Sequence, residues 1–155
     1  MSNTDTLRAQ VIPFGQVKLL LPNSAVAEVT RLTSEVDAGA SECEWLYGMI
    51  EWRGLTLPLI SIEGLLGLPI TPIEQAPRLI VLNTLSPDSN NAFIATAATN
   101  NPHLIKLQQE AIDEALQGEH DSHYIYCDYS LEGEKVLVPD LLAIEESLEK
   151  IHTTG

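Results

Sequence analysis

Two histidines and a cysteine toward the C-terminal end of the chain have types and spacing that could bind a metal ion. His120, His123 and Cys127 form an H-x-x-H-x-x-x-C run. Imidazole nitrogen and thiolate sulfur are common zinc ligands, but a structural zinc site needs four of them. No C-x-x-C or H-E-x-x-H motif accompanies the run, which falls where a loop is expected to enter a strand. The sequence therefore predicts loop histidines and a half-buried strand thiol rather than a metal site.

The sequence also gives little support for nucleophilic catalysis, phosphate binding or acid–base catalysis. Cys127 with a nearby histidine could form a nucleophilic dyad, but the local patterns that create an exposed thiolate of low pKa are missing. The phosphate-binding motifs G-x-x-x-x-G-K and G-x-G-x-x-G do not occur. The clustered carboxylates are predicted to lie on solvated faces rather than to form an acid and base pair: Glu110, Asp113, Glu114, Glu145, Glu146 and Glu149. We therefore expect no enzymatic activity and no required cofactor.

The size and composition of the chain restrict the remaining options. Its 155 residues suffice for one domain or two very small ones, and 45 % hydrophobic with 19 % charged residues are typical of a folded chain with a core. A formal net charge of −14 argues against nucleic-acid binding. No secretory signal or membrane span is visible, and Cys43 and Cys127 are interpreted as separate thiols. We expect a cytoplasmic protein without direct membrane insertion.

Most of the chain shows short strand patterns separated by turn residues. Three hairpins are expected to turn at Gly15, Gly54 and Gly133. Residues 108–117 have helical propensity. The apolar period after Pro139 predicts a C-terminal helix whose apolar face carries Leu141, Leu142, Ile144, Leu148 and Ile151. The strand patterns cover residues 10–14, 17–21, 25–29, 47–53, 55–60, 78–84, 92–98, 104–107, 124–129 and 135–138. So many short strands with one terminal helix favour compact β-barrels or a sandwich.

Residues 44–60 combine two tryptophans, two glycines, an arginine and a proline in one apolar run. Gly48 and Gly54 permit a positive φ or a close backbone approach, which is typical of a scaffold that carries an interaction surface. Arg53 lies beside the expected glycine turn of a strongly acidic chain. It must either pair with a carboxylate or face a partner, and the residue types alone leave both interpretations open.

Residues 45–60, WLYGMIEWRGLTLPLI, resemble the central motif of CheW-like domains, in which a W-x-x-G turn precedes an apolar strand, R-G and an L-P strand. Residues 16–29 are similar to the family's opening strand and A-x-E-V segment, with Glu28 at the family's acidic position. Further similarity lies in residues 65–67, 78–82 and 136–144. The resemblance therefore covers nearly the whole chain.

The resemblance implies a mainly β fold of two small five-stranded, SH3-like β-barrels that share a hydrophobic interface, followed by a C-terminal helix. Within a single CheW-like domain over residues 1–155, we expect the first barrel largely from residues 16–80 and the second largely from residues 81–138. The helix is expected over residues 139–151. Residues 108–117 are expected to form either a short helix, as their propensity indicates, or an irregular connection, as the family implies.

The same resemblance implies a non-catalytic adaptor that couples methyl-accepting chemoreceptors to a CheA-type histidine kinase. The kinase contact is expected on the first barrel, near the Arg53 turn, and Glu28 is the first candidate to pair with Arg53. The residues expected to serve protein interaction are Glu28, Gly48, Arg53, Gly54 and Pro58. The resemblance implies no cofactor.

Two departures from the family pattern bear on the subtype. Ser61 stands where the family usually has an aspartate, and residues 99–102 replace its V-D-x-V segment. With residues 19–29, these departures are more similar to the adaptors of pilus-associated chemosensory systems, the ChpC and PilI type. The alternative is a free-standing β-barrel protein-binding module outside chemotaxis, which neighbouring genes or a kinase pull-down would distinguish from an adaptor.

Overall fold

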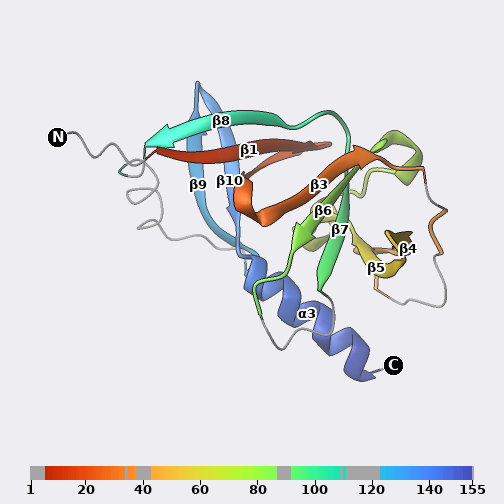
Figure 1. Ribbon diagram of the computed structural model, residues 1–155. Coiled ribbons are helices and arrows are strands. Elements are labelled where there is room, and N and C mark those ends of the chain that lie inside the picture. The colour runs from red at the N-terminus through yellow and green to blue at the C-terminus, as the bar shows by residue number, and fades with distance from the viewer. Residues whose placement is uncertain are drawn as a thin grey trace.

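The computed structural model describes residues 6–33, 35–37, 43–86, 92–108, 110 and 123–154, the last four of these for the backbone only. Its strands form two five-stranded sheets (Figure 1). The central sheet consists, in spatial order, of β3 (Val26–Arg31), β6 (Arg78–Asn83), β7 (Phe93–Ala98), β5 (Leu55–Ile60) and β4 (Leu46–Trp52). The terminal sheet consists of β8 (His103–Gln108), β1 (Thr6–Phe14), β2 (Val17–Pro22), β10 (Glu134–Pro139) and β9 (Ile125–Leu131). The short helices η1 (Asn23–Ala25), α1 (Ile62–Leu65) and η2 (Ile73–Gln75) connect strands, and α3 (Leu141–Thr154) ends the chain.

The mainly β fold with two five-stranded sheets and a C-terminal helix is confirmed, but the sheets divide the chain differently from the expected boundaries. Residues 17–22, expected in the first barrel, pair with β1 and β10 of the terminal sheet. Residues 93–98, expected in the second barrel, form β7 inside the central sheet. The division was misplaced because the hairpin at the start of the chain pairs with strands from its end. Such long-range pairing leaves no local sequence pattern.

The two sheets share one arrangement of strands. In each sheet a hairpin, β4–β5 or β9–β10, joins the other three strands through a parallel pair, β5 with β7 or β10 with β2. Both hairpins turn through two residues of positive φ, Arg53 (48°) with Gly54 (80°), and Glu132 (50°) with Gly133 (85°). Two positive φ angles define a type I′ turn, whose twist matches that of antiparallel strands. The turns predicted at Gly54 and Gly133 are therefore confirmed.

The strand ladders of the described residues leave both sheets open, so neither is a barrel closed by strand pairing. The edges of the central sheet are β3 and β4, which lie at opposite ends of the strand order. Past the end of β3, however, Asp37 exchanges two backbone hydrogen bonds with Met49 of β4, with N to O distances of 2.8 and 2.9 Å. This isolated bridge joins the two edges and curls the central sheet toward a barrel.

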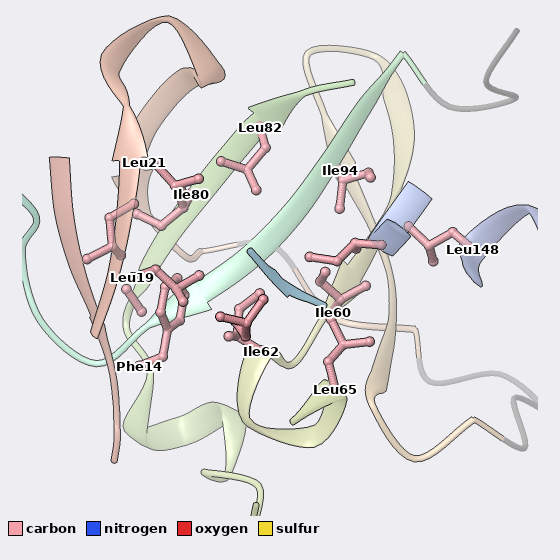
Figure 2. Close-up of a cluster of buried hydrophobic side chains, with 14 residues drawn as sticks. Phe14, Leu19, Leu21, Ile60, Ile62, Leu65, Ile80, Leu82, Ile94 and Leu148 are labelled. Atoms are coloured by element: carbon pink, nitrogen blue, oxygen red, sulfur yellow. The ribbon is translucent and has the colours of Figure 1, made fainter. Parts of the chain in front are cut away.

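Apolar side chains form three buried clusters. One cluster lies inside the central sheet, around Ile50 and Leu59, and a smaller one inside the terminal sheet, around Val11 and Val136. The largest cluster lies between the sheets and joins both of them to α3 (Figure 2). Its buried members are Ile12, Phe14, Leu19, Leu21, Ile60, Ile62, Leu65, Ile80, Leu82, Ile94, Ala98, Ile125, Ile144 and Leu148. The shared hydrophobic interface expected between the two halves is therefore present.

The C-terminal helix differs in one respect from the predicted pattern. Ile144 and Leu148 are buried as expected, and Asp140 Oδ1 accepts a hydrogen bond from the Ala143 amide at the helix start. Leu142, expected on the apolar face, is 44 % exposed, whereas Glu145, expected on the polar face, is only 3 % exposed. The prediction for Glu145 was wrong because a residue three positions before a buried leucine shares its helical face.

The prediction for residues 108–117 cannot be compared with the structure in full. Gln108 ends β8, and nearly all of the remaining positions lie outside the described residues.

Candidate functional site

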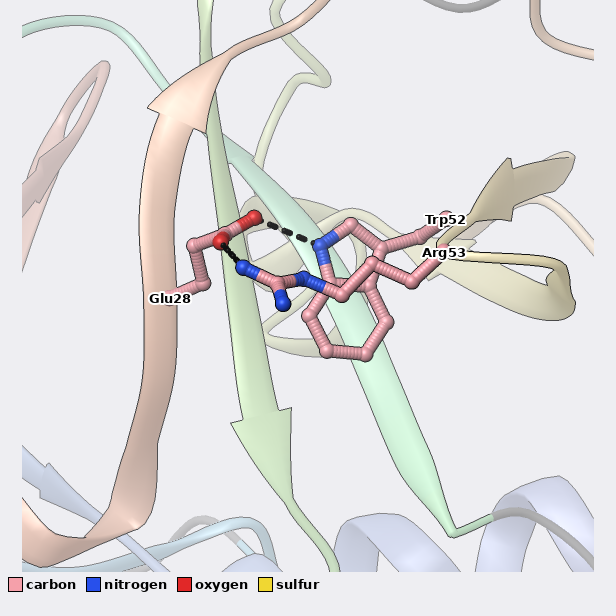
Figure 3. Close-up of polar contacts among 3 residues, drawn as sticks. All are labelled: Glu28, Trp52 and Arg53. Carbon is pink, nitrogen blue, oxygen red and sulfur yellow. Dashed lines mark hydrogen bonds and ion pairs between the residues drawn. The ribbon is translucent and has the colours of Figure 1, made fainter.

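A carboxylate on one edge of the central sheet contacts the hairpin on its other edge. Glu28 lies on β3, and Trp52 and Arg53 lie at the end of β4 and in the turn that follows it. One carboxylate oxygen of Glu28 accepts a hydrogen bond from the Trp52 indole at 2.6 Å, and the other forms an ion pair with the Arg53 guanidinium (Figure 3). The expected pairing of Glu28 with Arg53 is therefore confirmed. With the bridge at Asp37, these contacts connect the two edges of the sheet.

The tryptophan of this site holds the arginine as well as the carboxylate. The Arg53 guanidinium lies 5.3 Å from the centroid of the Trp52 ring, at the distance of a cation–π contact. Trp52 also packs edge-to-face on Phe93 of β7, with ring centroids 4.9 Å apart. Trp52 is thereby fixed against the interior of the sheet, while the Arg53 side chain is 68 % exposed. The geometry presents a positively charged group on a rigid aromatic base.

The same contacts change the acidity of Glu28. The hydrogen bond from the Trp52 indole, followed by the hydrogen bond and the charge of Arg53, lowers the pKa of Glu28 below its ordinary value of 4.5. Each of these groups stabilises the ionised carboxylate, because a protonated carboxyl accepts hydrogen bonds less well. Since the pKa is lower in the folded chain than in the unfolded one, the contribution to stability is complete above pH 4.5 and is lost as the pH falls through the folded value.

This linkage predicts a titration that can be observed at the indole. Lowering the pH should protonate Glu28 and weaken its bond with Trp52, so the Trp52 indole resonance in a 1H–15N spectrum should shift with a midpoint below 4.5. In a Glu28→Gln variant the shift should disappear, because glutamine does not titrate. A midpoint at or above 4.5, or a shift that persists in the variant, would show that another group controls the indole.

The structure separates the five residues expected to serve protein interaction into two groups. Glu28, Arg53 and Gly54 come together at the turn, where Arg53 and Gly54 are exposed. Gly48 is buried beside a bulge in β4, and Pro58 is fully buried in β5, where it pairs in register with Met49. Gly48 and Pro58 therefore position the hairpin from the interior.

The role of Trp52 was not predicted from the sequence, where it is one of two tryptophans in the apolar run of residues 44–60. The available signal was the position of Trp52 directly before Arg53, because an indole N–H that is partly buried usually finds an acceptor. Two exposed apolar side chains, Val29 (39 %) and Leu55 (44 %), flank Glu28 and Gly54 in the sequence. Each of the two segments that the Glu28–Arg53 ion pair joins thus carries an exposed apolar side chain.

Acidic groups dominate the surface beside this turn. A hollow of about 660 Å³ is lined by Glu35, Val36, Asp37 and Glu51. Glu51 directly precedes Trp52 on β4, so its side chain points to the opposite face of the strand from the indole. The negative field of such a hollow raises the local concentration of basic groups.

The residues weighed for metal binding do not form a site in the described chain. His123 is exposed, Cys127 is buried in β9, and His120 lies outside the described residues. Burial raises the pKa of the Cys127 thiol, which disfavours the thiolate form that metals and electrophiles require. Among the described residues there is no group of three or more His, Cys, Asp or Glu side chains that could hold a metal ion.

The fold and the site define a two-sheet β domain that displays a charged turn on the end of one sheet. The sequence matches the CheW-like domain family over residues 9–149, and the chain therefore belongs to this family. Its fold is similar to the crystal structure of the scaffolding protein TtCheW from Thermoanaerobacter tengcongensis, with a TM-score of 0.70 and 15 % sequence identity over 87 % of this chain and 89 % of that chain. No curated protein matches the sequence.

Proposed function

We propose that the chain is a non-catalytic adaptor that couples chemoreceptors to a CheA-type histidine kinase. The family membership and the likeness to a scaffolding protein support this role. An adaptor must bind two partners at once, and two small sheets with separate exposed edges provide surfaces for that purpose. We further propose a cytoplasmic location, supported by the thiol form of Cys43 and Cys127. None of the described helices is long and apolar enough to cross a membrane.

The observation that carries the proposal is the exposed side chain of Arg53, which Glu28 and Trp52 hold in place at a backbone position that does not favour arginine. A residue other than glycine or asparagine is uncommon at a φ of 48° and costs the fold about 1 kcal/mol. Asparagine would suit the type I′ turn better. Arg53 nevertheless occupies this position with a side chain that is 68 % exposed and a guanidinium fixed by Glu28 and Trp52. An unfavourable but rigidly held and exposed group is more consistent with partner binding than with stability.

Two substitutions of Arg53 separate binding from stability. Arg53→Ala and Arg53→Asn should each change Tm by less than about 3 °C, because an exposed ion pair contributes little. Both should weaken binding to the CheA-type kinase or to the receptor by about fivefold or more, since an exposed arginine on a rigid base is a typical hot spot. Calorimetric titration of the purified partners measures the affinity, and differential scanning calorimetry measures Tm.

The other hairpin provides the matched control. Glu132 has nearly the same φ as Arg53, 50° against 48°, in the same turn type. Glu132→Asn should therefore raise Tm slightly and leave kinase binding unchanged. If both Arg53 variants bind the kinase as tightly as the wild type, Arg53 has no role in partner binding. A Tm loss well beyond about 3 °C would show that Arg53 serves stability instead.

The adaptor role itself is tested with both partners. The purified chain should bind the kinase and a receptor fragment separately and should bring them into one complex on a sizing column. Binding to neither partner would refute the proposal and leave the alternative of a free-standing protein-binding module outside chemotaxis.

We propose further that the output concerns type IV pili. The support is the departure from the common family pattern at Ser61 and residues 99–102. Deletion of the gene should then impair twitching motility and spare swimming. The reverse result would place the chain in a flagellar system.

A further inference from the structure

A buried glutamate holds the turn of the terminal sheet's first hairpin against the central part of the chain. Glu63 lies on α1, directly after β5, and is only 3 % exposed. One of its carboxylate oxygens accepts hydrogen bonds from the amide, at 3.0 Å, and from the hydroxyl of Thr71. The other oxygen accepts the amide of Gln16 at 3.2 Å, in the turn between β1 and β2. A single carboxylate thus links the connection between β5 and β6 of the central sheet to the β1–β2 turn of the terminal sheet.

The same turn is held from its other side by the connection between β7 and β8. The Thr99 hydroxyl accepts the Gly15 amide at 3.1 Å, and the Thr99 amide donates to the Pro13 carbonyl at 3.0 Å. Gly15 packs so closely that a Cβ atom there would lie 2.5 Å from Thr71 Oγ1. The turn, whose residues Gly15 and Gln16 are exposed, therefore contacts polar groups from two connections.

These hydrogen bonds restrict the relative orientation of the segments that they join, which apolar burial alone does not do. The cluster between the sheets consists of aliphatic side chains with one phenylalanine, and apolar burial stabilises without fixing a direction. Hydrogen bonds with defined angles favour one arrangement, and a buried network of them favours a unique structure when every member is satisfied. No unpartnered side-chain N or O atom is buried among the described residues, so Glu63 and Thr71 form part of a satisfied network.

We propose that Glu63, Thr71 and the Gly15-Gln16 turn form a latch that fixes the orientation of the terminal sheet against the central sheet. Glu63 is a positioning residue in this device. In an adaptor the latch would also set the relative placement of the two partner surfaces; that consequence rests on the proposed function, whereas the latch itself does not.

Glu63→Gln is the substitution that opens the latch selectively. Glutamine keeps the shape of the side chain but has one acceptor oxygen, while its NH2 group can only donate. The oxygen should stay with Thr71, which supplies two donors, because water can replace the lost bond at the exposed Gln16. The NH2 group then faces the Gln16 amide, so Gln16 is released from residue 63 while the Thr71 contact and the two Thr99 bonds remain.

Amide hydrogen exchange and residual dipolar couplings of the free chain test this proposal. In the wild type, the Gln16 amide should be protected although the residue is exposed, and one alignment tensor should describe both sheets. In Glu63→Gln, exchange at Gln16 should rise about tenfold or more with little change at Thr71, and the sheets should require two tensors. If this variant does not fold, Glu63→Asp should give the same result, because its shorter side chain cannot reach both segments.

Glu145→Gln is the matched control. Glu145 is equally buried, at 3 %, and also accepts two backbone amides, those of Leu85 and Ser86, but it ties α3 rather than the β1–β2 turn to the central sheet. This control should leave Gln16 protected and the single tensor unchanged. An unprotected Gln16 in the wild type, or one tensor for both sheets in the Glu63 variants, would overturn the latch. Because no partner is present, either result leaves the adaptor proposal untouched.

Discussion

Replacement of Gly15 by alanine is expected to lower the free energy of unfolding by about 3 kcal/mol, the sum of backbone strain and a broken buried network. Gly15 has a φ of +65°, which an L-residue adopts at a cost of about 1 kcal/mol. The new Cβ would lie 2.5 Å from Thr71 Oγ1 and 2.6 Å from Glu63 Oε2. Both atoms belong to the hydrogen-bonded latch, so relief of the overlap must break its bonds. Thermal unfolding should show a Tm lower by about 6–12 °C.

Gly133→Ala is the control for this prediction. Gly133 has a φ of +85°, but a Cβ there would meet nothing within 4 Å. The control therefore contains the backbone strain without the steric overlap, and it should cost about 1 kcal/mol. If Gly15→Ala and Gly133→Ala lower the free energy of unfolding equally, the polar groups around Gly15 move aside without a measurable loss of stability.

Replacement of Glu145 by alanine is expected to lower the free energy of unfolding by about 2 kcal/mol. The Glu145 carboxylate accepts the amides of Leu85 and Ser86 at 2.7 and 3.0 Å, so it ties α3 to the connection after β6. Its removal leaves a cavity beside the helix and two amides without their acceptor. Chemical denaturation should show a lower midpoint with an unchanged slope, as for a loss of native contacts in a two-state transition.

Glu146→Ala provides the comparison on the same helix. Glu146 is exposed and adjacent in sequence, so its replacement changes net charge and helix propensity in the same way. We expect a change within about 0.5 kcal/mol, as for most surface substitutions. Similar losses for both glutamates would refute the assigned role of the Glu145 carboxylate.

The sequence by itself determined the local elements and the class of protein. Alternating apolar residues marked the strands, and glycines marked turns that need a positive φ, as at Gly54 and Gly133. Serine is a residue type that favours the first position of a helix, and the Ser61 hydroxyl accepts the Gly64 amide at 3.1 Å at the start of α1. The joint presence of W-x-x-G, R-G and L-P residues indicated the family that the comparison then showed. All of these signals depend on residues close together in the chain.

Part of the candidate site was also readable from the sequence. The pairing of Glu28 with Arg53 was predicted because both positions match a charged family pattern, and the structure contains it. The indole of Trp52 was not predicted as the second donor, because an uncharged residue in an apolar run gives little sign that it needs a polar partner.

Only the tertiary structure decided which strands share a sheet and which carboxylates are buried. Residues 17–22 belong with β10 because a parallel pair forms across more than a hundred residues, and no local pattern encodes that choice. Glu63 and Glu145 look like ordinary surface glutamates in the sequence. Each is buried only because folding brings amides from a distant segment to its oxygens, 47 and 60 positions away at the farthest. A buried carboxylate is tolerated when such donors replace water, and their arrival is a property of the assembled fold.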